Sequence, residues 1–77
     1  MLFRSDGDHV VVHVQSTANP GDIVVAGIPG EEATVKTYLR QRDKVVLRPA
    51  NPALTDMVFA PGDVTVYGRV VTVLRRL

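Results

Sequence analysis

Short valine-rich runs, separated by clusters of turn formers, constrain this chain more than any other feature of its sequence. The clearest runs are residues 9–14, 23–26, 44–48 and 69–77. Their β-branched side chains suit a pleated sheet better than a helix. No window of ten or more residues shows the 3.6-residue period of an amphipathic helix. The pattern predicts an all-β fold of about five to seven short strands, arranged as a small rolled sheet or partly open barrel.

Turn chemistry predicts where the strands begin and end. Residues 19–22 have the sequence Asn-Pro-Gly-Asp, which favours a type II turn, and residues 61–63 repeat this chemistry. A further turn at 28–30 leads into a strand at 31–39, in which Lys36 shares a face with the other even-numbered residues. Residues 40–43 form a charged hairpin turn. Two prolines exclude a ladder at 49–53, and residues 54–60 form a loop or an irregular edge strand. Gly68 is expected to bulge or bend the chain between a short strand at 64–67 and the longest strand, at 69–77.

Length and composition exclude several classes of protein. Seventy-seven residues make a single small domain, 1–77, whose modest core makes a partner chain or additional sequence plausible. There is no cysteine for a disulfide or a thiolate metal site. The net charge is +1, and acids and bases are interspersed without the clustered basic face of a nucleic-acid binder. The basic pair at 75–76 fits a solvated strand end.

The sequence shows no targeting or membrane signal. The apolar stretch at the start of the chain is too short for a signal peptide, because polar residues begin at Arg4. No apolar run approaches the roughly 20 residues that a membrane helix needs. We therefore expect a cytoplasmic protein without membrane contact.

Lys36 lies in the middle of the predicted strand at 31–39. It can be a solvated lysine on a half-exposed strand, or it can be a general base. An apolar pocket disfavours the charged form of a lysine, and burial can lower a lysine pKa to about 5–6. The neutral amine can then take the proton of a serine hydroxyl. Spacing alone leaves both possibilities open.

Other polar residues have simpler structural interpretations. His9 and His13 share a strand face, but no third ligand is evident nearby, so we expect solvated or interface histidines and no metal or cofactor. The remaining candidates are aspartates expected to bind local backbone in turns, and tyrosines expected in the core or at an interface: Asp6, Asp8, Asp22, Asp63, Tyr38 and Tyr67.

Five segments together resemble the C-terminal domain of LexA-type repressors, the self-cleaving serine peptidases of the bacterial SOS response. These segments are residues 6–12, 19–26, 32–36, 47–53 and 68–75. Residues 32–36, Glu-Ala-Thr-Val-Lys, match the segment that carries the family's catalytic lysine almost letter for letter. The resemblance runs from about residue 6 to the C-terminus, and the actinobacterial members look closest. It implies a sheet of the LexA and signal-peptidase type, with Lys36 as the general base of a Ser-Lys dyad.

The family's nucleophilic serine is expected outside this sequence. The family carries it in a Gly-Asp/Asn/His-Ser-Met type motif a few residues before the acidic turn at 6–8. Ser5 is followed by Asp6 instead of methionine, and Ser16 lies beyond the first strand, so neither matches. The family's cleavage loop and its DNA-binding helix-turn-helix domain are expected upstream as well. We therefore expect a C-terminal piece or a truncated relative that cleaves nothing by itself.

The resemblance also concerns the bond that the family cuts in itself. That bond is Ala-Gly and lies upstream of the serine. Ala26-Gly27 has the same residues but ends a predicted strand, where the glycine is expected to serve the following turn.

The resemblance implies partners for the complete protein. An edge strand that is apolar on both faces invites aggregation unless it is paired, and the family pairs its closing strand across a two-fold axis. We therefore expect a homodimer with Val71, Val73 and Arg75 at the interface. The RecA filament would act on the full-length protein, and DNA would bind only the N-terminal domain. A non-catalytic dimerising β module and a fragment of a signal-peptidase-like protease are the alternatives.

Overall fold

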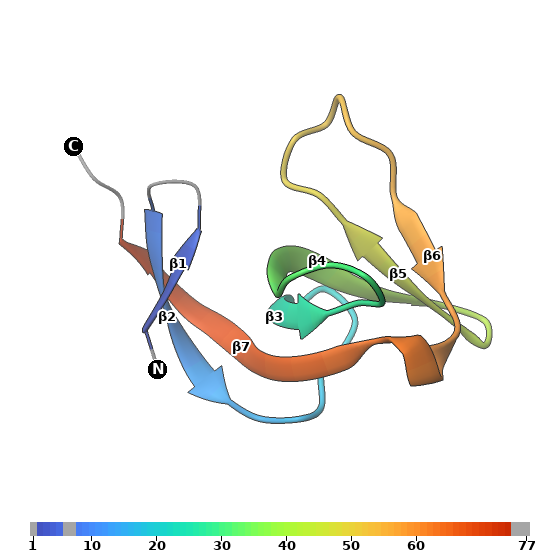
Figure 1. Cartoon of the computed structure of the whole chain (residues 1–77), viewed down its shortest axis with the longest axis horizontal. Helices are drawn as coiled ribbons and strands as arrows, with labels where there is room; N and C mark the ends of the chain where they lie inside the picture. The colour runs from blue at the N-terminus through green and yellow to red at the C-terminus, as the bar shows by residue number, and fades with distance from the viewer. Residues whose placement is uncertain (1, 6–7, 75–77) are drawn as a thin grey trace.

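The computed structural model describes residues 2–5 and 8–74, and these residues form one antiparallel sheet of seven strands (Figure 1). The spatial order is β1-β2-β7-β3-β4-β5-β6. The predicted all-β fold is therefore confirmed. The described elements are β1 (Leu2–Ser5), β2 (Asp8–Val14), β3 (Ile23–Gly27), β4 (Thr34–Gln41), β5 (Lys44–Arg48), β6 (Met57–Phe59), the 3₁₀ turn η1 (Pro61–Asp63) and β7 (Thr65–Leu74).

The closing strand β7 joins the two halves of the sheet, since it pairs with β2 on one side and with β3 on the other. The bulge expected near Gly68 is confirmed, whereas the two strands expected on either side of it form one continuous strand. Register shifts leave Val71 without an opposite residue on β2 and Tyr67 without one on β3. These bulges absorb the bend, so the strand continues through the glycine (Figure 1).

Close packing explains the glycine in the middle of β7. A Cβ at Gly68 would overlap Val12 Cγ1 and would lie 2.8 Å from the carbonyl oxygen of His13. Both neighbours belong to β2, which pairs with β7 here. The missing side chain at position 68 therefore lets two central strands pack closely.

Strand bounds differ from the predicted ones at three places. Residues 2–5 form β1, which pairs with β2, although the short apolar start had not been predicted as a strand. β4 begins three residues later than predicted and runs into the charged turn. Within residues 54–60, only Met57–Phe59 pairs, as the terminal strand β6. Each difference reflects pairing with a strand that is adjacent in sequence, which the composition of one segment alone does not encode.

The turn at residues 19–22 has the predicted type II form. Gly21 has a φ of +95°, and the amide of Asp22 donates to the carbonyl of Asn19 at 3.0 Å. The Asp22 carboxylate accepts a hydrogen bond from the amide of Asn19 at 2.9 Å, as predicted for a turn aspartate. Residues 61–63 differ, because Gly62 lacks a positive φ and the segment is a 3₁₀ turn.

In the described part of the chain, nine of the ten buried apolar side chains form two clusters, and Val46 belongs to neither. Val24 belongs to the first cluster and Val25 to the second. Adjacent strand residues project to opposite faces, so the two clusters lie on opposite faces of the sheet at β3. The first cluster comprises Val24, Ala26, Ile28, Tyr38, Val45 and Leu47, and the second comprises Val10, Val12 and Val25.

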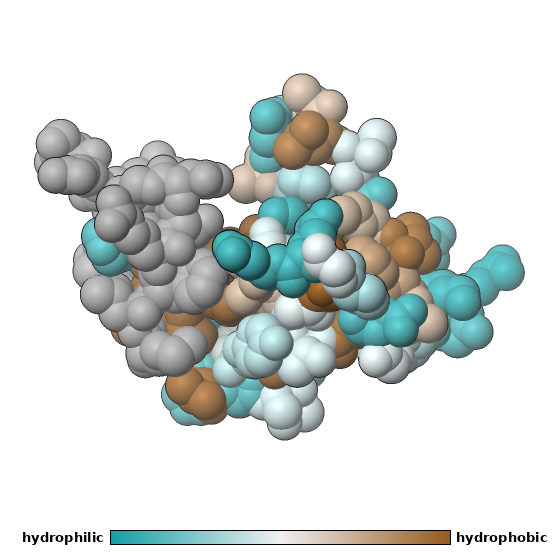
Figure 2. Space-filling model, viewed as in Figure 1, coloured by the Kyte–Doolittle hydropathy of each residue, from teal (hydrophilic) through white to brown (hydrophobic). Residues whose placement is uncertain are grey.

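The predicted valine face of β2 is buried at Val10 and Val12, whereas Val14 is 64% exposed. Over the visible face of the molecule, hydrophobic and hydrophilic residues are intermixed (Figure 2). No helix in the described part of the chain is long and apolar enough to cross a membrane.

Candidate active site

Lys36 lies in β4 directly opposite Val24 of β3. Opposite residues in a ladder share a face, so Lys36 projects on the side of the first apolar cluster. Tyr38, two residues along the same strand, also belongs to that cluster. The lysine itself is half-buried. Strand alternation thus places Lys36 on the same face as Tyr38, as predicted, and on the side of the first apolar cluster.

Two hydrogen bonds hold the amine of Lys36. Its Nζ donates to Thr34 Oγ1 at 2.6 Å and to the carbonyl oxygen of Val35 at 3.3 Å. Thr34 can act in this way because residues two apart on a strand share a face. An ammonium group has three donors, so one position on Nζ has no partner among the described residues. In the neutral amine this position is the lone pair, which is the site that could accept a proton.

The ion pair in the described part of the chain lies on the other face of the sheet. Arg48 and Asp56 join at 2.9 Å, and Arg48 is opposite Thr37, which alternates with Lys36. Their mutual hydrogen bonds raise the pKa of Arg48 and lower the pKa of Asp56. No described carboxylate pairs with Lys36.

The register places a row of basic residues on the Lys36 face. Lys36 is opposite Val24, Val24 is opposite Arg69 of β7, and Arg69 is opposite His13 of β2. The half-buried guanidinium of Arg69 makes no hydrogen bond with another described residue. His13 Nδ1 donates to Gln15 Oε1 at 2.9 Å. Sequence reasoning missed Arg69, because its register opposite β3 depends on a pairing between distant segments.

A model of the peptidase S24-like family matches residues 3–71. This chain belongs to the peptidase S24-like family. The match covers six of the seven strands entirely or nearly so, and it includes Lys36 and Arg69. It supports a serine-peptidase fold of the LexA and signal-peptidase type.

The two serines of this S24-like chain lie in different parts of the fold. Ser5 ends β1, and three strands separate β1 from β4 in the sheet order. Ser16 is exposed in the link between β2 and β3, and it makes no hydrogen bond with Lys36. The expectation that neither serine is the nucleophile stays a prediction.

The Ala26-Gly27 bond lies inside the fold. Ala26 is fully buried and Gly27 is the last residue of β3. Gly27 does not adopt a positive φ; instead, a Cβ there would lie 2.6 Å from Tyr67 Oη. The atoms that this Cβ would meet belong only to the ring end of Tyr67, which is 46% exposed and can move, and the turn beyond uses Gly30 at positive φ.

The other predicted candidates have these positions. Among the described residues, no group of three histidine or acidic side chains could hold a metal ion. Tyr38 is buried in the core, as predicted, and Tyr67 is 46% exposed. Val71 and Val73 are exposed, whereas Arg75 lies outside the described residues.

Proposed function

We propose that this chain is the C-terminal part of a LexA-like SOS-response repressor, with Lys36 as the general base of a Ser-Lys self-cleavage dyad. The supporting observation is the half-buried amine on the apolar-cluster face, held by Thr34 and the Val35 carbonyl, with one position of Nζ open. Membership of the peptidase S24-like family supports the same role. The protein would act in the cytoplasm.

In the proposed reaction, a serine from outside residues 1–77 approaches the open position on Lys36 Nζ. The neutral amine takes the hydroxyl proton as the serine oxygen attacks the carbonyl carbon of the Ala-Gly bond. The resulting ammonium returns the proton to the leaving amine, and water then hydrolyses the acyl-enzyme. Thr34 and the Val35 carbonyl orient Nζ throughout these steps.

Dimerisation through the closing strand is the second part of the proposal. β2 pairs with β7 as far as Leu74, whereas β3 pairs with β7 only as far as Arg69. The other edge of β7 beyond Arg69 therefore has no ladder partner among the described residues. Val71 and Val73 lie in this stretch and are 47% and 45% exposed. These features also favour the alternative of a non-catalytic dimerising β module.

The resemblance adds two partners to the proposal for the complete repressor. The RecA filament on single-stranded DNA would stimulate the cut, which relieves repression. DNA would bind the N-terminal helix-turn-helix domain and not this chain. Loss of the cleaved N-terminal domain from the dimer would then weaken operator binding.

Self-cleavage of a fusion tests the catalytic role. The segment of a LexA-like relative that carries the cleavage bond and the serine is joined ahead of Met1, and cleavage is followed at alkaline pH on denaturing gels. Lys36→Ala should abolish cleavage. Lys44→Ala is the matched control, because Lys44 is exposed at the start of β5, and it should cleave at the wild-type rate. Cleavage of the fusion that carries Lys36→Ala would contradict the assignment of Lys36 as the general base.

A further inference from the structure

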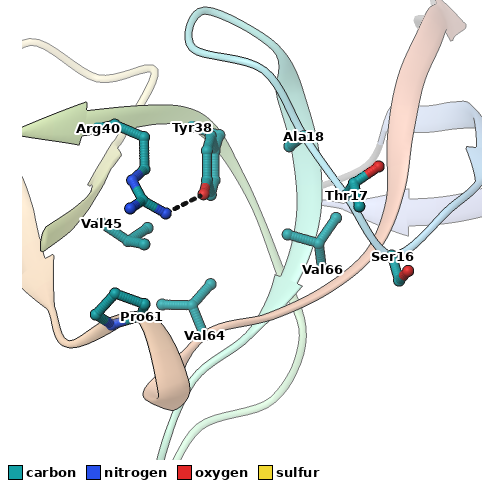
Figure 3. A pocket seen from close by; sticks show the side chains of 9 residues that line it. All are labelled: Ser16, Thr17, Ala18, Tyr38, Arg40, Val45, Pro61, Val64 and Val66. Carbon is teal, nitrogen blue, oxygen red and sulfur yellow. Dashed lines mark hydrogen bonds between the residues drawn. The ribbon is translucent and has the colours of Figure 1, made fainter. Parts of the chain in front are cut away.

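A hollow of about 340 Å³ opens beside β4, and Lys36 is not among the residues that line it (Figure 3). Ligand pockets in proteins typically have volumes of about 300–1,000 Å³, so the hollow can admit a small molecule or one peptide residue. Its walls come from four parts of the chain: the β2–β3 link, β4, β5, and the segment from η1 into β7. The lining residues are Ser16, Thr17, Ala18, Tyr38, Arg40, Val45, Pro61, Val64 and Val66.

The floor and the rim of the hollow differ in chemistry. Val45, Val64 and Val66 belong to the first apolar cluster or pack against it. Figure 3 shows Arg40 and Tyr38 together on one side, with the valines and Pro61 below and beside them. None of the nine lining residues is acidic. The hollow therefore combines an apolar floor with one cationic rim.

Tyr38 and Arg40 present hydrogen-bond donors at that rim. Tyr38 is only 8% exposed, and its oxygen accepts a hydrogen bond from Arg40 Nη1 at 3.5 Å. The phenolic proton of Tyr38 has no acceptor among the described residues. The guanidinium has five N–H donors, of which one is used in this contact. A nearly buried hydroxyl and a guanidinium thus leave donors unused beside an apolar floor.

We propose that this hollow binds a carboxylate carried on a short branched aliphatic body. The planar fork of a guanidinium matches a carboxylate and can bind it through two parallel hydrogen bonds. The phenolic O–H of Tyr38 would donate a further hydrogen bond, and the valines would contact the aliphatic body. The ligand can be a free acid or the C-terminal leucine of a peptide, since both present this chemistry. This site is independent of Lys36 and of self-cleavage.

A titration of the isotope-labelled chain followed by two-dimensional amide NMR tests the site. The probes are 3-methylbutanoate and its neutral amide, and a ligand this small is expected to bind in the millimolar range. The acid should produce saturable shifts at the amides of Ala18, Tyr38, Val45 and Val64, and the amide probe should not. Equal binding of both probes, or no saturation with the acid, would overturn the proposal.

Variants assign the contacts. Arg40→Gln and Tyr38→Phe should each weaken binding of 3-methylbutanoate about tenfold, as expected for loss of a hydrogen bond to a charged group. Arg48→Gln and Tyr67→Phe are matched controls away from the hollow and should change affinity less than twofold. Unchanged affinity in Arg40→Gln would contradict the proposal. Arg40 is exposed, so this variant should fold even if Tyr38→Phe does not.

A peptide arm distinguishes the two sources of the carboxylate. A tetrapeptide that ends in leucine is compared with the same peptide carrying a C-terminal amide. Tighter binding of the free peptide than of 3-methylbutanoate, with shifts at the same amides, would identify a peptide C-terminus as the ligand. A peptide that shifts none of these amides, together with saturable binding of the acid, would identify a small acid.

Discussion

Replacement of Gly68 by alanine tests how the two halves of the sheet are joined. The new Cβ would meet Val12 Cγ1 and the carbonyl oxygen of His13, the latter at 2.8 Å. Val12 is buried and β-branched, so its side chain has little freedom to turn aside. The carbonyl oxygen can move only with the backbone of β2. Relief of the overlap therefore requires β2 and β7 to separate.

The expected cost follows from two opposing terms. Overpacking of a well-packed interior costs about 1–3 kcal/mol. Replacement of glycine by alanine returns about 0.4–1 kcal/mol by restricting the unfolded chain. We expect a net loss of about 1–2.5 kcal/mol, because one of the two obstacles is backbone. For a domain of this size, each kcal/mol lowers Tm by roughly 4–8 °C, so Tm should fall by roughly 5–20 °C.

Thermal unfolding by circular dichroism measures this effect. Gly62→Ala is the matched control, because a Cβ at position 62 meets nothing within 4 Å and the residue lacks a positive φ. Its Tm should equal or slightly exceed that of the wild type. Val12→Ala should reduce the additional cost of Gly68→Ala, since it removes one of the two obstacles. A Tm for Gly68→Ala within 2 °C of that of Gly62→Ala, where about 5–20 °C is expected, would refute the reasoning.

Three further outcomes follow from the structure. Arg42 has a φ of +57° in the two-residue β4–β5 turn, a conformation that glycine adopts without strain. Arg42→Gly should therefore raise the free energy of unfolding, measured by urea denaturation, by up to about 1 kcal/mol. A lower free energy of unfolding would contradict this. Arg48 lowers the pKa of Asp56, so the stabilisation from this ion pair is present above the unfolded carboxyl pKa of about 3.8 and is lost as pH falls through the lower folded pKa. The Tm of Asp56→Asn should therefore differ from that of the wild type at pH 6 and converge with it at pH 2. A difference in Tm that is the same at both pH values would contradict the linkage. Val71→Lys and Val73→Lys should each convert a dimer into a monomer by light scattering, whereas Val58→Lys, an exposed valine on β6, should not.

Local composition was sufficient to predict most of the strands. The run at 44–48 corresponds to β5 residue for residue, and those at 9–14 and 23–26 differ from β2 and β3 by one residue. The type II turn at 19–22 followed from proline and glycine at its central positions. These features depend on neighbouring residues, which is why the sequence alone specifies them.

The features that were missed depend on which strands pair, and the composition of a single segment does not show this. Glycine usually weakens or interrupts a strand, but two bulges let β7 continue through Gly68. β1 becomes a strand only because β2 offers it a ladder.

The same distinction applies to the sites. The alternation of residues along β4 predicted which face of the sheet Lys36 lies on. The row of basic residues from Lys36 to Arg69 depends instead on the register of β4, β3 and β7. The hollow at Arg40 requires four separate segments to converge, and no local motif marks it.

The central claim is that the Lys36 amine accepts the proton of the serine, and chemical rescue tests it most directly. In the self-cleaving fusion, Lys36→Ala removes the amine and leaves space beside Thr34, and added methylamine can then supply an amine from solution. We expect Lys36→Ala to be inactive alone and methylamine to restore cleavage in proportion to the concentration of its neutral form, with no effect on Lys44→Ala. Full cleavage by Lys36→Ala without added amine would contradict the account.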